Sequence, residues 1–246
     1  MTADKQKENK HKETSVNRAI LAVAAGCTLF ALFGCNNRNE TEMVQPTQVE
    51  ELKPMQQSWR GVLPCADCEG IETSLFLQKD GSWVMNQRYQ GGKAPSVFGT
   101  YGNWARTADK LVLTDSQGDK TYFRAKGEAL EMLDQEGNPI ESSLNYTLQP
   151  VKAPLPATPM AMRGMYKYMA DAAVFTDCAT GKEVAVASNA QLERDYAAAR
   201  GTELKPILLV VEGHFALEPN PDTGAAQKVL VTNNKGKFSA DKGCDE

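Results

Sequence analysis

The first half of the chain alternates between apolar and polar residues in short runs separated by turn signals. From residue 71 to residue 77, every second side chain is apolar or small, while Glu72 and Ser74 fall on the opposite face. The residues "KDGS" at 79–82 predict a tight hairpin, after which "WVMNQRY" alternates again. The pattern predicts eight antiparallel strands without a helix, at residues 58–63, 71–77, 83–89, 97–105, 110–114, 121–125, 129–133 and 144–148.

A meander of eight strands is expected to close into an up-and-down barrel, because closure removes the unpaired edges of the sheet. A β-sandwich is the alternative that the same pattern allows. A barrel of about eight strands has an interior that is either filled by side chains or holds one small ligand. The first folded domain is therefore expected at residues 55–149.

The second half of the chain follows a different pattern. Four prolines within "QPVKAPLPATP" predict an interdomain linker at residues 150–160. Beyond it, runs at 160–170, 172–177 and 182–187 predict three strands, residues 188–200 a helix, and runs at 207–218 and 228–232 two more strands. Ser188 with Gln191 three positions later resembles a capping box, and Gly201 marks the helix end. This is the element order of an OB-fold, expected at residues 161–246, so the fold class is all-β to α+β.

The N-terminal region has the features of an export signal. Five basic side chains precede an uncharged, largely apolar run from Ala19 to Phe33, which is followed by a small residue. The sequence "LFGC" resembles a bacterial lipobox, in which the cysteine thiol is alkylated by diacylglycerol. Residues 1–34 are therefore expected to be a signal peptide with an extended N-terminus, Cys35 the lipidated residue, and residues 35–54 a flexible, polar tether.

Charge and composition exclude two functional classes. The net charge is −4, and residues 1–34 carry five basic and three acidic side chains, so the mature chain has a charge of −6. Such a surface argues against a nucleic-acid partner, although OB-folds often bind oligonucleotides. The mature chain has one histidine, His214, for which a role in the core is expected, and it has no phosphate-binding loop or acid–base pair. We therefore expect that the protein is not an enzyme.

Six cysteines reduce to four in the mature chain, because Cys27 leaves with the signal peptide and Cys35 carries the lipid. The remaining four enter an oxidising compartment in which disulfides persist, and they allow three connectivities. They are Cys65, Cys68, Cys178 and Cys244.

The "CADC" motif at residues 65–68 allows several interpretations. A thioredoxin-type site needs a helix after the motif, whereas Gly70 leads into a predicted strand. A zinc site needs four ligands, usually from a second CxxC or paired histidines. A local disulfide between Cys65 and Cys68 remains, and a reducible pair that binds Cu(I) is the alternative. Thioethers also suit Cu(I), but core filling is the more usual role of the methionines at the start of the second domain, Met160, Met162, Met165 and Met169.

Several longer segments resemble one known family. They are "LFGCNN", "ELKPMQQSWRGVLPCADCEGIETSLFL", "ADKLVLTD", "RGMYKYMADAAVFTDCATGK" and "VEGHFALEPNPDTGA". Together they are similar to the NlpE family, also called CutF, of outer-membrane lipoproteins of enterobacteria. The similarity covers nearly all of the mature chain, from Cys35 to Cys244, which makes it far more specific than a CxxC motif alone.

The resemblance implies an N-terminal lipocalin-like barrel that contains the CxxC motif, a C-terminal OB-like domain and a role in copper tolerance. It also implies activation of the Cpx envelope-stress response through the sensor kinase CpxA, on surface adhesion or when lipoprotein trafficking or disulfide formation fails. Asn36 is not the aspartate that retains lipoproteins in the inner membrane. Delivery to the outer membrane by the lipoprotein-sorting machinery is therefore expected.

Three functional classes remain. A non-enzymatic sensor lipoprotein is the first, a copper-binding protein that uses Cys65 and Cys68 is the alternative, and a thiol oxidoreductase is the third. With these two cysteines adjacent in the barrel, Cys178 and Cys244 are left to pair within the second domain. Loss of that pair is expected to loosen the second domain while the barrel survives, so that the fold itself would report failed oxidation.

Overall fold

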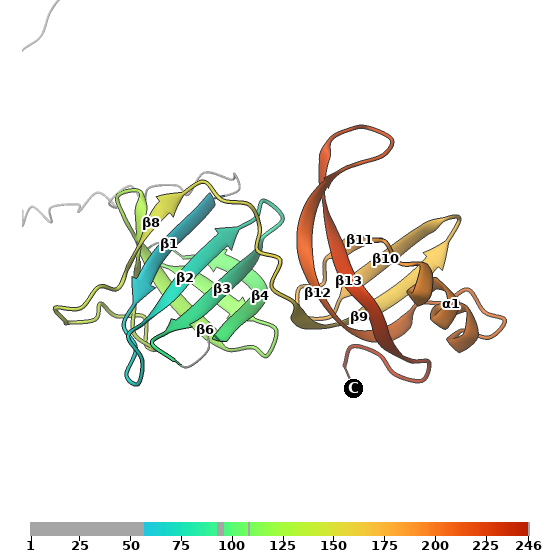
Figure 1. Ribbon diagram of the computed structural model, residues 1–246, viewed down its shortest axis with the longest axis horizontal. Helices are drawn as coiled ribbons and strands as arrows, with labels where there is room; N and C mark the ends of the chain where they lie inside the picture. Colours follow the sequence, from blue (N-terminus) through green and yellow to red (C-terminus); the bar gives the residue numbers. More distant parts are fainter. Residues whose placement is uncertain (1–56, 93–95, 108, 246) are drawn as a thin grey trace, which may run out of the picture. The chain divides into compact units, whose positions relative to one another are not determined.

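A computed structural model of the protein describes residues 57–92, 96–107 and 109–245. The expected signal peptide at 1–34, the lipidated Cys35 and the tether at 35–54 lie outside these residues. All of the described residues belong to the second of the chain's two units, Pro46–Glu246. The second unit contains two closed β-barrels, one formed by β1–β8 and the other by β9–β13 (Figure 1).

The first barrel is an antiparallel meander in which each strand pairs with its neighbours in the sequence and β8 pairs with β1. The predicted closure into an up-and-down barrel of eight strands is confirmed. The strands are β1 Gln57–Leu63, β2 Gly70–Leu77, β3 Ser82–Gln90, β4 Ser96–Arg106, β5 Leu111–Asp115, β6 Lys120–Lys126, β7 Ala129–Met132 and β8 Thr147–Val151.

Alternation along the strands fills the interior of this barrel. Leu75 and Leu77 on β2 and Trp83 and Met85 on β3 pack into one buried cluster with apolar residues of the other strands. The indole of Trp59 donates a hydrogen bond to the carbonyl of Glu128 at 2.8 Å, which satisfies its buried N–H group. The barrel interior is thus packed with its own side chains.

The last strand differs from the prediction. A strand was expected at 144–148, but β8 begins at Thr147 and continues through Pro150 to Val151. The amide of Asn145 explains the later start, because its oxygen accepts a hydrogen bond from the backbone of Thr147 and its nitrogen donates to the carbonyl of Val62. An asparagine that bonds its own backbone two residues on favours a turn over a strand.

The second barrel has the sheet order β10-β11-β13-β12-β9, with β11 and β13 parallel. Its elements are β9 Met160–Met169, β10 Ala172–Asp177, β11 Glu183–Ala187, α1 Ala190–Ala199, β12 Ile207–Pro219 and β13 Ala226–Ser239. The predicted order of three strands, one helix and two strands is confirmed, and β12 and β13 form a long twisted hairpin (Figure 1).

The helix α1 covers one end of this barrel through two residues one turn apart. Leu192 and Tyr196 are its buried positions, and the hydroxyl of Tyr196 donates to the carbonyl of Lys205 at 2.7 Å. Tyr196 also meets Tyr166 edge to face, with ring centroids 5.4 Å apart. The predicted capping box is wrong, because the N-cap is Asn189 rather than Ser188 and makes no side-chain capping bond.

Two further expectations differ from the structure. His214 is only partly buried, because it lies on the face of β12 opposite Val211 and Phe215, which are in the core. The strand expected at 228–232 is far longer, since β13 continues to Ser239 and pairs with β12 along most of its length.

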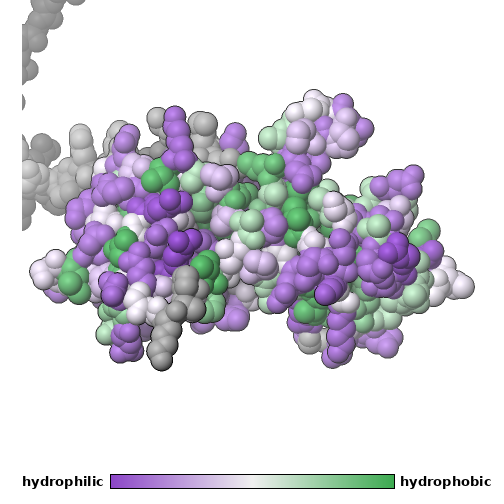
Figure 2. Space-filling view, viewed as in Figure 1, coloured by the Kyte–Doolittle hydropathy of each residue, from purple (hydrophilic) through white to green (hydrophobic). Residues whose placement is uncertain are grey.

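The surface shows no single apolar face in the view of Figure 2, where hydrophobic residues lie in small patches among hydrophilic ones. Large exposed apolar side chains include Phe98 and Leu144, at 55% and 61% exposure. Within the described ranges, no helix is both long and apolar enough to cross a bilayer.

Candidate functional site

The CxxC motif forms a small loop between β1 and β2 of the first barrel. Cys65 and Cys68 are joined by a disulfide, with their Cα atoms 5.3 Å apart. The chain enters β2 at Gly70, so the motif is followed by a strand rather than by the helix of a thioredoxin-type site. In this state both sulfurs are bonded to each other and provide no thiolate for a metal.

The four methionines that were considered as copper ligands do not form one group. Met160 and Met162 are buried in the core of the second barrel, whereas Met165 and Met169 line a groove of about 290 Å³ on β9 and β10. Among the residues that the structure describes, no group of three or more His, Cys, Asp or Glu side chains could hold a metal ion.

The second pair of cysteines lies beside the end of β10. Cys178 is bonded to Cys244, which is 66 residues further along the chain. The backbone N–H of Cys178 donates to the carbonyl of Arg163 on β9 at 2.9 Å. The guanidinium of Arg163 in turn donates to the carbonyl of Gly243 at 2.6 Å, so the same residue of β9 contacts the chain on both sides of the disulfide.

Asp177, the residue before Cys178, organises the turn between β10 and β11. One carboxylate oxygen of this buried side chain accepts hydrogen bonds from the backbone N–H and the hydroxyl of Thr180, at 2.7 Å and 2.8 Å. Gly181, with φ of +67°, closes the turn by donating to the carbonyl of Asp177 at 2.8 Å. We refer to residues 177–182 as the Asp177 turn.

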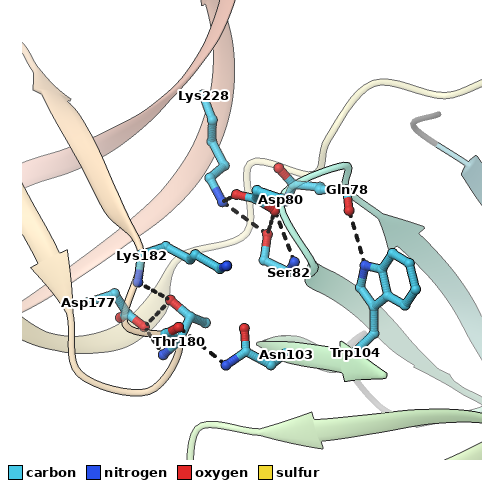
Figure 3. A network of polar contacts seen from close by, with 9 residues as sticks. All are labelled: Gln78, Asp80, Ser82, Asn103, Trp104, Asp177, Thr180, Lys182 and Lys228. Carbon is cyan, nitrogen blue, oxygen red and sulfur yellow. Dashed lines mark hydrogen bonds and ion pairs between the residues drawn. The ribbon is translucent and has the colours of Figure 1, made fainter. Parts of the chain in front are cut away.

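The Asp177 turn contacts β4 of the first barrel. The hydroxyl of Tyr101 donates to the other carboxylate oxygen of Asp177 at 2.7 Å, and both side chains are buried. Burial, together with the nearby Asp177 carboxylate, raises the pKa of Tyr101 far above its usual value, so the phenol stays protonated and remains a donor. Two residues further along β4, the amide of Asn103 donates to the carbonyl of Thr180 at 3.3 Å (Figure 3).

A second polar contact joins β13 to the hairpin between β2 and β3. The ammonium of Lys228 pairs with the carboxylate of Asp80 and donates to the hydroxyl of Ser82 at 2.9 Å (Figure 3). Burial of Asp80 raises the pKa of its carboxyl, but the hydrogen bonds from Lys228 and Ser82 outweigh it, so the net pKa is lowered. The side chain of Lys228 is only 11% exposed, which makes this pair less screened than an ordinary surface ion pair.

Apolar side chains lie between the two polar contacts. Phe76, Val84 and Tyr101 from β2, β3 and β4 belong to the same buried cluster as Phe215 and Met160 of the second barrel. The rings of Tyr101 and Phe215 meet edge to face with centroids 5.5 Å apart, and the ammonium of Lys228 lies 4.8 Å from the Phe215 centroid.

The disulfide of the second barrel borders a hollow next to this network. The hollow has a volume of about 290 Å³, and its lining includes Cys178, Cys244, Tyr101 and Arg163. The cysteine pair, Tyr101 of the first barrel and Ala179 of the Asp177 turn therefore border the same hollow.

The polar network was not predicted from the sequence. Asp80 and Lys228 are 148 residues apart, and Tyr101 and Asp177 are 76 apart. Each of these residues is unremarkable within its own strand or turn, and no spacing or motif connects them. Phe76 and Val84 are apolar residues on the outward side of alternating strands. They were the available signal in the sequence that another part of the protein covers the outside of β2 and β3.

Two protein families match the chain, one for each barrel. The family described as NlpE N-terminal domain matches residues 59–143, and the family described as NlpE C-terminal OB domain matches residues 156–245. The lipoprotein NlpE of Escherichia coli (strain K12) is 66% identical over 230 residues, which cover 93% of this chain and 98% of that protein. The crystal structure of the Cpx pathway activator NlpE from Escherichia coli is 67% identical and covers 78% of this chain and 100% of that chain, with a TM-score of 0.40.

Proposed function

Because the chain belongs to the NlpE lipoprotein family, we propose that it is an outer-membrane lipoprotein, anchored through Cys35, that activates the Cpx envelope-stress response. The observation that carries the proposal is the 66% identity over 93% of this chain to a protein whose crystal structure is described as that of a Cpx pathway activator. Such a role requires no catalytic residues. The partner in this proposal is the sensor kinase CpxA.

The anchor supplies the first part of the proposed mechanism. A lipidated protein that the sorting machinery delivers to the outer membrane is kept away from a kinase in the inner membrane. Signalling is then weak while trafficking succeeds and becomes strong when lipoproteins stay in the inner membrane. Adhesion to a surface is a further stimulus that the family resemblance supplies.

The second disulfide supplies a redox input. The bond between Cys178 and Cys244 closes 66 residues of the second barrel, and it borders the contacts that this barrel makes with β4. A chain in which this bond has not formed has a less constrained second barrel. The protein would then report a failure of oxidative folding through its own stability.

The proposal is tested by moving the anchor. Asn36→Asp should retain the protein in the inner membrane and raise a Cpx reporter constitutively, whereas Asn37→Asp is a matched control that places the same charge one residue later. Membrane fractionation confirms the location of each variant. A reporter that stays at the wild-type level when Asn36→Asp is shown to be in the inner membrane would refute the proposal.

Copper tolerance is a second candidate function, favoured by one observation. The two sulfur atoms of Cys65 and Cys68 are held side by side in a loop in which both residues are only partly buried. Reduction would convert them into two thiolates suited to Cu(I). This function and the signalling role are compatible, because the CxxC loop lies in the first barrel and the second disulfide in the other.

A further inference from the structure

The outer face of β2, β3 and β4 is apolar where an isolated barrel would meet water. Phe76 and Val84 alternate with side chains that point into the barrel, such as Leu77 and Trp83, so they lie on its outside. Yet Phe76, Val84 and Tyr101 are 6%, 1% and 2% exposed. They are buried because the second barrel covers them, with Phe215 packed against Tyr101. We call these three residues and the adjoining Asp80 and Ser82 the covered face.

Polar contacts hold the second barrel on the covered face. The Asp177 turn accepts hydrogen bonds from Tyr101 and Asn103 on one side. On the other side, Lys228 pairs with Asp80 (Figure 3). An interface of a few hydrogen bonds and one ion pair around an apolar centre is typical of contacts that can open.

The Asp177 turn is directly connected to the disulfide. Asp177 is the neighbour of Cys178 in the chain, and both N–H groups are used within the second barrel, that of Asp177 on the carbonyl of Lys182 and that of Cys178 on the carbonyl of Arg163. Without the bond to Cys244, Cys178 loses its covalent link to the chain end and keeps the hydrogen bonds of its backbone. The carboxylate that receives the Tyr101 hydroxyl is then held less firmly.

From this connection we infer that the Cys178–Cys244 disulfide keeps the covered face closed through the Asp177 turn, and that chains lacking the bond expose this face to a protein partner. The partner that fits has an apolar, aromatic patch flanked by a cation that faces Asp80. This is the pattern that the second barrel itself presents through Phe215 and Lys228. The inference describes how the proposed Cpx activation is controlled. It rests on the proposed function for the statement that an exposed face leads to Cpx signalling.

The linker between the barrels provides a physical readout of opening. Ala153 and Leu155 pack against the buried cluster, whereas the neighbouring Lys152 is exposed. Cleavage by trypsin after Lys152 requires the segment to leave the cluster, so its rate measures opening. The reaction is followed by intact mass on the purified mature lipoprotein in detergent, because cleavage separates the two barrels.

Exchanging the charges of Asp80 and Lys228 tests the contact between the barrels while the disulfide stays intact. Asp80→Lys and Lys228→Asp each place like charges opposite one another and should accelerate cleavage about tenfold. The double variant Asp80→Lys/Lys228→Asp restores opposite charges and should return the rate toward that of the wild type. Lys120→Asp, at an exposed position on β6, makes the same charge change away from the face and should have no effect.

The disulfide is tested in the same assay. Cys178→Ser/Cys244→Ser should also accelerate cleavage, and Cys65→Ser/Cys68→Ser should not. The inference is overturned if Cys178→Ser/Cys244→Ser or either single charge variant is cleaved at the wild-type rate, or if the double charge variant is cleaved as fast as the single charge variants.

A Cpx reporter in cells separates this inference from the proposed function. Both the charge variants and Cys178→Ser/Cys244→Ser should raise reporter output, with the double charge variant near the wild-type level. If the cysteine variant signals but the open charge variants do not, the covered face is not the partner's surface and the inference fails while the proposed function stands. If Asn36→Asp in the inner membrane also gives no signal, the proposed function fails. The cleavage rates then decide by themselves whether the disulfide and the Asp80–Lys228 pair keep the covered face closed.

Discussion

Removal of the second disulfide should destabilise the second barrel far more than the first. In the chain-entropy treatment, a bond that closes 66 residues contributes about 4 kcal/mol to stability. The Cys65–Cys68 bond, with a separation of 3 residues, contributes about 2 kcal/mol. Since a whole domain is stable by only about 5–15 kcal/mol, Cys178→Ser/Cys244→Ser should remove a large share of the stability of the second barrel.

The distribution of tryptophan allows the two barrels to be followed separately. All three tryptophans, Trp59, Trp83 and Trp104, lie in the first barrel, so their fluorescence in urea reports that barrel alone. Far-UV circular dichroism reports both barrels. For a small domain with a urea slope of about 2 kcal/mol/M, a loss of about 4 kcal/mol lowers the unfolding midpoint of the second barrel by about 2 M.

The expected result for Cys178→Ser/Cys244→Ser is therefore an early transition in circular dichroism that precedes the fluorescence transition. The control variant Cys65→Ser/Cys68→Ser should shift the fluorescence transition by about half as much in free energy. If the cysteine pair of the second barrel can be removed with no early transition, or if both signals move together, the assignment of this bond as the main constraint on the second barrel is wrong.

Three further predictions concern single contacts. Gly164→Ala should lower the stability of the second barrel by about 1–3 kcal/mol in thermal unfolding, because an added Cβ would lie 2.4 Å from Phe175 Cζ, while Gly243→Ala, with nothing within 4 Å, should be neutral. Since the pKa of Asp80 is lowered on folding, its pair with Lys228 stabilises the closed state above the pKa of the unfolded carboxyl, about 4, and this stabilisation is lost as the pH falls through the lower folded value. The protection factors of the amides in residues 152–159, which correct for the intrinsic slowing of exchange in acid, should therefore fall as the pH drops below about 4, and they should fall more in the wild type than in Asp80→Asn; equal profiles would contradict this. Finally, in a Cys178→Ser/Cys244→Ser background, which removes the other thiol pair, the oxidised protein should bind no Cu(I) at micromolar concentration, the reduced protein should bind it, and Cys65→Ser should abolish binding; retention by that variant would exclude the CxxC loop as the site.

The sequence predicts the architecture of both barrels because strand alternation is a local property. In residues 71–89, apolar and polar side chains alternate on both sides of the "KDGS" turn, which predicts a hairpin. The structure pairs β2 with β3 over that stretch. Local side-chain chemistry accounts for the errors. Asn145 delays β8 by bonding its own backbone, and the end of β13 contains polar residues such as Asn233 and Lys235 that carry no apolar alternation. These residues form a strand because β12 pairs with them, which only the tertiary fold can determine.

The candidate site shows the same division between local and distant information. The CxxC motif is visible in four consecutive residues, whereas the contacts of Tyr101 with Asp177 and of Lys228 with Asp80 join strands from different barrels. A surface tyrosine, lysine or aspartate in a single sequence is usually solvated, so no pattern marks these as partners. Only the burial of Tyr101 and Lys228 in the folded structure identifies them.

The order of the disulfides along the chain has a consequence for biosynthesis. Each bond joins cysteines that are consecutive in the exported sequence after Cys35, first Cys65 with Cys68 and then Cys178 with Cys244. An oxidant that joins thiols in the order in which they emerge from the translocation channel therefore makes only native pairs, and no isomerase is needed to correct them. The two bonds differ in timing, because Cys68 follows Cys65 at once, while Cys178 waits for 66 more residues to cross the membrane. During that interval Cys178 has no native partner, because Cys65 and Cys68 are partners of each other.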